Sequence, residues 1–404
     1  MTDYNRILSA CNDHSAMSDR IISESFIFDF ASRENLEKDF IRRINPYSEI
    51  MVSLGKDWLS CAVPQYFAHR IFRPNGLIRK YIGDKTIRTY DEKDLAFLEF
   101  QRTHPWRFCF SEIRGNPSGN FFKMTDVFSG EDFLLYSPAI GQTLQHEGVM
   151  SLWFNLIFFN GECWQTFSMI NWYQSFDADD IFYYASEINP KISSEEDLIA
   201  DLDKNPVPYM MLFSASGIPR FVSRGMDVLH ILGEHTVPDF DVRAARRFFE
   251  VKQSGNVYEL TFEEWREFPH MAQAYFDKKK KILLLSTLTD QGYAQMISRF
   301  SELGVFLPEE PDVRVHMTML TAMKKILKKK IRMNPYEQLF EQKSSPGQEA
   351  ELGKINNFLQ LAMKEMNAGR QPNVEKLAKM AGVDVDTARE ILAATIDKFN
   401  EMKK

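Results

Sequence analysis

A run of short strands separated by tight turns lies between residues 106 and 173, and it constrains the fold more than any other sequence feature. Its clearest turn is Asn160-Gly161, because both residue types tolerate the positive φ angles of a two-residue hairpin. The preceding segment, Val149–Phe159, is apolar at nearly every position, which predicts burial on both faces. The run therefore predicts an antiparallel meander, curled into a small sheet or a partly closed barrel and packed on helices.

The remaining segments surround this meander with helices and a second mixed unit. The chain has 404 residues, of which 44% are hydrophobic, so it is long enough for roughly two to three domains. The predicted fold class is α+β. Its parts are a helical region at 1–104, the β-meander at 105–187, an α+β unit at 188–312, a basic amphipathic helix at 313–333, a linker at 334–348 and a three-helix, helix-turn-helix-like module at 349–404.

Charge is distributed unevenly along the chain. The net charge is −7, but residues 313–404 hold 17 Lys and Arg against 11 Asp and Glu. The cations concentrate in the predicted basic helix, as Lys324, Lys325, Lys328, Lys329, Lys330 and Arg332. Such a patch can be simply the solvated face of a structural helix, or it can bind nucleic-acid phosphates, an anionic membrane surface, a protein partner or the acidic body of the same chain. Its apolar face has Met but neither Trp nor Phe, which argues against membrane insertion.

The segment Leu377–Leu392 resembles the helix-turn-helix of bacterial repressors. Ala378 is small where two helices would cross, Gly382 suits the turn, and Val383 would fill the corner. The resemblance implies DNA binding, with Val385, Thr387 and Arg389 nearest the bases. The segment departs from this pattern in the acidic residues of its second helix, because carboxylates repel phosphates. A packing or partner-docking role therefore stays open.

A second resemblance covers residues 105–307. The segment Phe121–Glu131 is similar to a strand and hairpin of uncharacterised bacterial proteins that often carry a zinc-binding SEC-C tail. That tail is absent here, so its zinc chemistry does not carry over. The resemblance implies a β-meander with an α+β body and no known activity.

Few residues suggest chemistry, and we expect no catalytic residues, cofactor or metal. Cys11 and His14 form an isolated pair, which is typical of an ordinary core or surface. His230 and His235 flank Gly233 and are expected in a solvated loop. Neither a phosphate-binding glycine loop nor a nucleophile elbow occurs.

These observations favour a non-enzymatic regulatory or adaptor protein that binds nucleic acid through the basic helix and the C-terminal module. The alternative is a structural or interaction protein whose C-terminal module docks on a partner or self-associates. An enzyme with a pocket assembled from distant residues is a third hypothesis. The four scattered cysteines and the lack of a signal-peptide pattern predict a cytoplasmic protein with reduced thiols.

Overall fold

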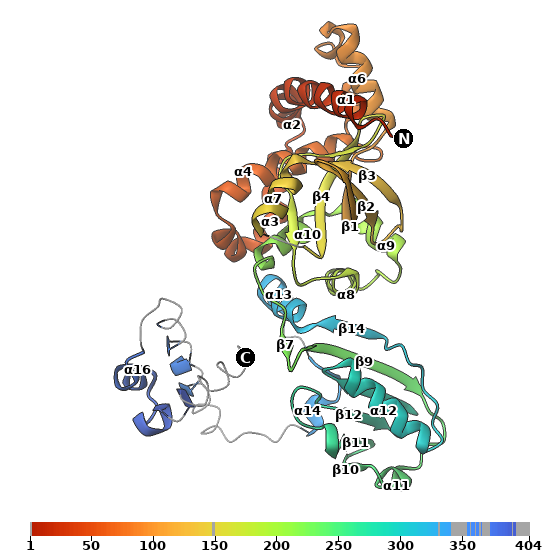
Figure 1. Ribbon diagram of the computed structural model, residues 1–404, viewed down its shortest axis with the longest axis vertical. Helices are drawn as coiled ribbons and strands as arrows, with labels where there is room; N and C mark the ends of the chain where they lie inside the picture. The colour runs from red at the N-terminus through yellow and green to blue at the C-terminus, as the bar shows by residue number, and fades with distance from the viewer. Residues whose placement is uncertain are drawn as a thin grey trace.

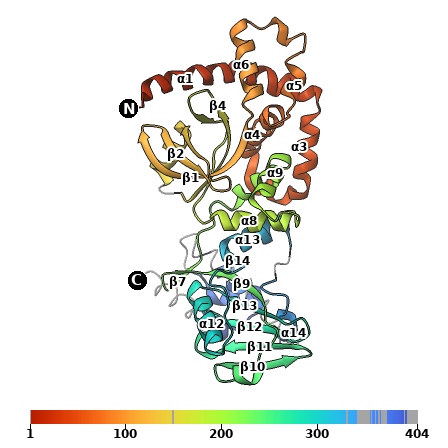
Figure 2. The same ribbon diagram turned by 90° about the vertical axis from the view of Figure 1, so that its right-hand side faces the viewer.

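Two folded bodies lie end to end along the long axis of the computed structural model (Figure 1; Figure 2). The structure describes residues 2–147, 150–329, 332–340, 354–355, 357–359, 361–362, 365, 372–389 and 391–392. Residues 2–219 together with helix α13 (Met317–Leu327) are called the barrel body. Residues 226–316 and 332–340 are called the sheet body. The predicted α+β class is confirmed.

Helices precede the first strand of the barrel body. They are α1 (Tyr4–Met17), a π-helix (Ser18–Phe30), α2 (Ala31–Arg33), α3 (Leu36–Ile44), α4 (Ser48–Phe72), α5 (Ile78–Tyr81) and α6 (Glu92–Thr103). Side chains cap two of these helices: Asp3 caps α1, and Asp91 caps α6 by accepting from the backbone N–H of Asp94 at 2.8 Å. Gly55, at φ 79°, interrupts α4, and only glycine adopts such a conformation easily.

The predicted strand-rich region is a closed barrel. Its strands are β1 (Arg107–Ser118), β2 (Phe121–Asp126), β3 (Asp132–Tyr136), β4 (Leu152–Phe159), β5 (Trp164–Thr166) and β6 (Asn171–Tyr173). They are ordered β1-β2-β3-β5-β4-β6, and β4 also pairs with β1, which closes the ring. The strands were expected to form an antiparallel meander, but β3 pairs with β5 in parallel, so the ring is mixed. Helix α7 (Pro138–Glu147) connects β3 to β4. A hairpin joins β4 to β5 at the predicted place, but its connection is residues 160–163 and not the two-residue turn expected, because Phe159 pairs with Trp164. Of the two turn residues, Gly161 has a positive φ, at 97°, and Asn160 does not.

Strand β4 is buried on both faces, as its sequence predicts. Trp153 and Ile157 point into the barrel interior. Phe154 and Phe158 alternate with them and pack against the helices in the largest apolar core of the molecule. This alternation follows from the two-residue repeat of a strand, and it attaches the barrel to the helices.

Further helices complete the barrel body on the side of the second sheet. They are α8 (Ala178–Ile188), α9 (Glu195–Lys204) and α10 (Val207–Met211). Helix α13 also packs here, because its residues Met319, Met323 and Ile326 belong to the same apolar core as Phe154. The chain therefore returns to the barrel body after it has formed the sheet body.

The sheet body is an antiparallel sheet with one long helix on one face. Its strands are β9 (Leu229–Thr236), β10 (Phe249–Ser254), β11 (Val257–Phe262), β12 (Gln273–Asp277), β13 (Ile282–Thr287) and β14 (Val313–His316), in the order β10-β11-β12-β13-β9-β14. Helix α12 (Asp290–Glu302) packs Tyr293, Met296 and Phe300 on the sheet. Short elements complete it: β7 (Val222–Ser223), β8 (Met226–Asp227) and α11 (Val242–Ala245).

The structure differs from three of the predicted boundaries. The α+β unit expected over 188–312 starts later, because Leu198 and Leu202 of α9 and Met210 of α10 belong to the apolar core of the barrel body. The single basic helix expected over 313–333 begins as strand β14, which pairs with β9, and becomes helical only at Met317. It ends at Leu327, because Lys328 adopts a left-handed conformation at φ 53°. The linker expected over 334–348 begins with ordered residues: Tyr336 is buried against Tyr275 of the sheet, and α14 (Glu337–Phe340) follows. Residues 341–348 lie outside the described residues.

The described part of the C-terminal module contains helix α16 (Val374–Ala381) and a second helical stretch at 385–389. Gly382 ends α16 at φ 71°, and the Val383 N–H donates to the Ala378 carbonyl at 3.0 Å. Leu377, Ala388 and Leu392 share an apolar core with Phe358. The family resemblance of this segment stays a prediction.

Candidate functional site

Three of the predicted nucleic-acid contacts, one in α13 and two directly after it, contact the barrel body. Lys325 Nζ donates to the Ser214 carbonyl at 3.0 Å. Lys328 Nζ lies 2.5 Å from Glu49 Oε1, and Lys329 Nζ lies 3.7 Å from Glu187 Oε2. Lys324 and Arg332 are exposed, and Lys330 lies outside the described residues. The structure therefore brings three of the predicted cations onto groups of the same chain.

The predicted base-contacting residues of the C-terminal module have partners within the module. Val385 is half-buried against its apolar core. The Thr387 N–H donates to Asp384 Oδ2 at 3.1 Å, which caps the second helical stretch. Arg389 lies 3.0 Å from Asp386 Oδ1 and 2.9 Å from Glu375 Oε1.

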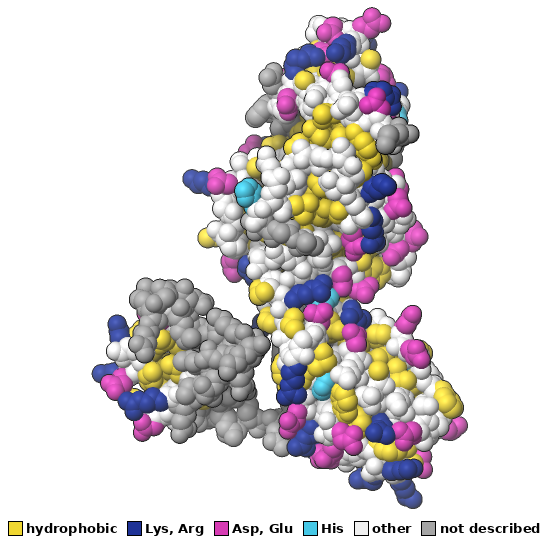
Figure 3. Space-filling view, viewed as in Figure 1, with side chains coloured by type: hydrophobic (Ala, Val, Ile, Leu, Met, Phe, Trp, Pro, Cys, Tyr) yellow, Lys and Arg dark blue, Asp and Glu magenta, His cyan; other side chains and the backbone are white. Residues whose placement is uncertain are grey.

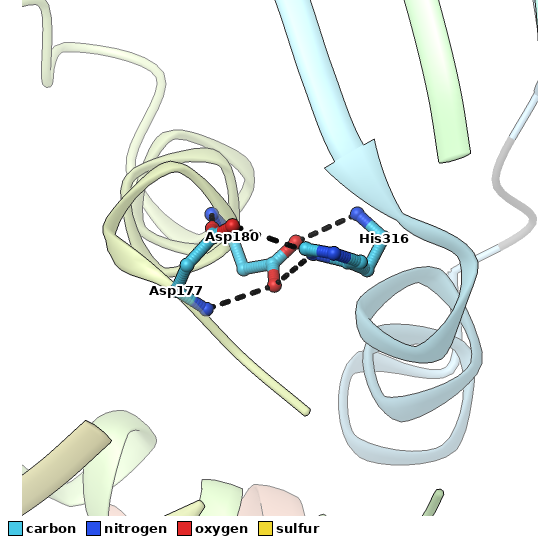
Figure 4. Close-up of side chains that lie close together, drawn as sticks. All are labelled: Asp177, Asp180 and His316. Atoms are coloured by element: carbon cyan, nitrogen blue, oxygen red, sulfur yellow. Dashed lines mark hydrogen bonds and ion pairs between the residues drawn. The ribbon is translucent and has the colours of Figure 1, made fainter. Parts of the chain in front are cut away.

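A charged cluster that the sequence analysis missed lies between the two bodies. It consists of Asp177, Asp180 and His316 and is called the junction cluster (Figure 4). Asp177 and Asp180 lie at the start of α8 in the barrel body, and His316 ends β14 in the sheet body. In the described residues, it is the one group of three or more His, Cys, Asp or Glu residues whose ligand atoms converge.

The two aspartates are fixed by a capping box at the start of α8. The Asp180 N–H donates to Asp177 Oδ1, and the Asp177 N–H donates to Asp180 Oδ2, both at 3.1 Å. This reciprocal pairing satisfies two N–H groups that have no partner inside the helix. It also holds both carboxylates at one end of α8, where the helix dipole favours negative charge.

His316 completes the cluster from the other body. Its backbone N–H donates to Asp180 Oδ1 at 2.8 Å, and its Nδ1 lies 2.9 Å from Asp180 Oδ2. Asp177 Oδ2 lies 3.5 Å from the same nitrogen. His316 also precedes α13 as its N-cap residue. The Asp180 carboxylate of the barrel body therefore binds both the backbone and the ring of His316, the last residue of the sheet body before α13.

Burial and charge shift the pKa values of His316 and Asp180 in opposite directions. Burial alone would lower the pKa of His316, but the hydrogen bond and negative charge of Asp180 outweigh it and raise that pKa. Burial raises the pKa of Asp180, although the hydrogen bond from His316 opposes the shift. The negative charge of Asp180 therefore compensates the positive charge of a protonated His316.

Other charges surround the cluster. Asp227 Oδ2 lies 3.8 Å from His316 Nε2 and also contacts Arg220 at 3.4 Å. Two strand residues earlier, Arg314 makes a two-pronged contact with Asp290, at 2.8 and 2.9 Å. Figure 3 shows basic, acidic and His side chains together at the waist between the bodies.

The cluster can act in two ways chemically. An imidazole nitrogen and two carboxylate oxygens within 4.8 Å of one another are a donor set for a divalent first-row metal ion. However, protein N–H groups already donate to both oxygens of Asp180, so its lone pairs have partners without a metal. The geometry fits best an ionic tie that holds the two bodies together.

Two histidines predicted to lie in a solvated loop are instead on strand β9. His230 is buried, and neither of its ring nitrogens has a hydrogen-bond partner among the described residues. Burial lowers its pKa to about 4. His235 lies further along the same strand, paired with Leu283. The prediction failed because Gly233 was interpreted as a turn, whereas it lies within the strand where the ring of Tyr293 packs closely.

No family model, no curated protein and no solved structure matches the chain. Within the described residues, no helix is both long and apolar enough to cross a membrane.

Proposed function

We propose that the chain is a non-enzymatic adaptor protein whose C-terminal module binds the same module of a second copy. The junction cluster holds its two bodies together as the platform that carries the module. The observation that carries the proposal is the charge balance of the exposed side chains among residues 372–389, the longest continuous stretch of the module that the structure describes.

Among residues 372–389 the exposed charged side chains are three acids and three bases. They are Glu375, Lys376, Lys379, Asp384, Asp386 and Arg389. A surface of this kind offers no net attraction to a polyanion such as DNA, whose binding depends on cations that neutralise phosphates. The same surface is electrostatically compatible with itself, as a two-fold symmetric interface requires.

An exposed apolar side chain lies in the middle of this balanced surface. Met380 is 60% exposed on the outer face of α16, between Lys379 and the buried Ala381. Methionine is flexible and polarisable, so it fills irregular gaps at protein contacts. A pair of Met380 side chains across a two-fold axis would supply the apolar centre of the interface.

The basic residues of α13 support a protein contact in preference to a nucleic-acid contact. Lys328 and Lys329 lie beside Glu49 and Glu187, so DNA would have to compete with carboxylates of the same chain. Because nearby carboxylates offset their charge, Lys328 and Lys329 attract phosphates less strongly than two unpaired lysines would.

Sedimentation velocity of the full chain over a range of concentrations tests the proposal. The expected result is a monomer that becomes a dimer as concentration rises, with dimerisation lost in Met380→Glu. Val52→Glu is the matched control, because Val52 is 85% exposed on α4 of the barrel body, and it should dimerise as the wild type does. A wild-type chain that stays monomeric throughout, or a Met380→Glu chain that dimerises normally, would contradict the proposal.

A further inference from the structure

Two buried cysteines from distant parts of the sequence face each other in the barrel body. Cys11 lies on α1 and Cys163 lies in the turn between β4 and β5, and their Sγ atoms are 3.4 Å apart. Both are free thiols and at most 1% exposed. A disulfide requires its sulfurs to approach to about 2.05 Å, so small side-chain rotations separate this pair from a bond.

The surroundings of the two sulfurs form a built polar site. The Asn160 side-chain amide donates to Cys11 Sγ at 3.3 Å and to Cys163 Sγ at 3.7 Å. Asn160 is held in turn, because its amide also donates to Gln165 Oε1 at 2.9 Å and its oxygen accepts from the Cys163 N–H at 2.8 Å. The same amide donor thus faces both thiols, and a donor at this position stabilises a thiolate.

The two cysteines differ in how easily they ionise. The hydrogen bond from Cys163 lowers the pKa of Cys11, and the Asn160 amide acts in the same direction against burial. The pKa of Cys163 is raised, first by its interaction with Cys11 and then by burial. The Asn160 amide also lies closer to Cys11 Sγ than to Cys163 Sγ, at 3.3 Å against 3.7 Å, so Cys11 is the thiol that is better placed to form a thiolate, whereas Cys163 keeps its proton.

We propose that Cys11 and Cys163 are an oxidative modification site, which hydroperoxides convert to a disulfide that fastens α1 to the β4–β5 turn. The Cys11 thiolate attacks the terminal oxygen of the hydroperoxide, so an S–O bond forms and the O–O bond breaks. The leaving alkoxide takes up a proton and departs as an alcohol, or as water when the oxidant is hydrogen peroxide.

The second step closes the disulfide. The Cys163 sulfur attacks the sulfur of the Cys11 sulfenic acid, which forms the S–S bond and breaks the S–O bond. The released hydroxide combines with the Cys163 proton and leaves as water. The two electrons lost by the sulfurs reduce the hydroperoxide, so no further reductant or oxidant is needed.

The other two cysteines are chemically distinct from this pair. Cys61 is half-buried on α4, and its Sγ has Ser60 as a neighbour at 3.9 Å. Cys109 is buried on β1 and donates to Asp126 Oδ2 at 3.2 Å, and burial raises its pKa well above the usual range. Neither has a second thiol in contact, so they serve as internal controls.

The position of the site suggests what oxidation would change. Helix α1 contacts the barrel through a small apolar cluster of Ile7, Cys11, Phe121 and Cys163 and through the exposed pair Arg6 and Glu162. A disulfide there would close a loop of roughly 150 residues, and such a cross-link restricts the unfolded chain strongly. Oxidation would therefore add a covalent cross-link between the N-terminal helix and the barrel, and reduction would leave only the noncovalent contacts.

Thiol counting after treatment with hydrogen peroxide tests the proposal. The full-length Cys61→Ser protein, in which the more accessible thiol is removed, is treated while folded, then denatured and alkylated. We expect the number of alkylatable thiols to fall from three to one, with a cross-linked peptide pair that contains residues 11 and 163. Dithiothreitol should restore all three thiols.

Two variants sharpen the result. Cys109→Ser, made in the Cys61→Ser protein, should still lose both remaining thiols on oxidation. Cys163→Ser in the same background should form no intramolecular disulfide and should accumulate Cys11 sulfenic acid, which a dimedone probe traps. Retention of all three thiols, or a cross-link that survives Cys163→Ser, would overturn the proposal.

Discussion

The two ends of helix α13 carry charge in opposite ways. At its start, His316 is buried and bound to the carboxylate of Asp180 through both its backbone N–H and its ring. At its end, Lys328 is about half exposed and lies beside Glu49, which is itself 76% exposed. The comparison teaches that burial decides how much an ion pair contributes to the free energy of unfolding. Loss of a partner is costly for a buried charge, whereas water replaces the partner of a charge at the surface.

The largest expected effect is at the buried end. Asp180→Ala removes the acceptor for three N–H groups and leaves them buried, so we expect a loss of about 3–5 kcal/mol in the free energy of unfolding. Urea denaturation measures it. Asp179→Ala is the matched control on the same helix turn, because Asp179 is exposed, and its effect should be below about 1 kcal/mol. Equal losses in the two variants would contradict the comparison.

The second prediction concerns His230, which is buried without a carboxylate partner in the part of the chain that the structure describes and should make the protein less stable in acid. The pKa of His230 is about 4 in the folded protein, below its ordinary value of 6.5, so the unfolded chain binds the proton more readily. Stability present above pH 6.5 should therefore fall by about 3 kcal/mol as the pH drops to 4. His230→Phe should remove that part of the loss. Parallel stability curves for the variant and the wild type would show that His230 does not titrate as expected.

His316, one strand away, should give the opposite sign. Its pKa is raised in the folded state, so its contribution is complete below pH 6.5 and is lost as the pH rises through the raised pKa. We expect His316→Gln to cost about 1.5–3 kcal/mol in mildly acidic solution and less in alkaline solution. Unfolding curves at several pH values check this. A cost that grows with pH would mean that Asp180 does not hold a protonated imidazole.

The smallest expected effect is at the exposed end of α13. Lys328→Ala and Lys329→Ala should each change the free energy of unfolding by less than about 1 kcal/mol, since surface ion pairs contribute little and are screened by salt. Lys324→Ala, on the same helix, is the control. The difference between the lysine variants and the control should shrink further as salt is added. A loss of stability as large as that of Asp180→Ala would contradict the expected difference between the buried and exposed ends of α13.

The sequence predicted those parts of the fold whose signals are local. The Asn160-Gly161 turn and the continuous apolar run before it are within a few residues of each other, and both the position of the hairpin and the two-sided burial of β4 are confirmed.

Contacts between residues that are far apart in the chain could not be predicted from local sequence patterns. His316 meets Asp180 across 136 positions, and no repeat or motif links them. The Asp-x-x-Asp spacing of 177 and 180 was a local capping signal, yet it indicates only the start of a helix. Strand β14 was missed because its four residues merge with the amphipathic pattern of α13, and only pairing with β9 makes them a strand.

The most direct test of the account measures DNA binding by the full chain. Fluorescence anisotropy with labelled duplex DNA, titrated over a range of salt concentrations, compares the wild type with a Lys324→Ala, Lys328→Ala, Lys329→Ala variant. We predict weak binding that is the same for both proteins, because Lys328 and Lys329 lie beside carboxylates of the barrel body and the exposed charges of residues 372–389 are balanced. Tight binding that weakens steeply with salt and is lost in the lysine variant would contradict the account.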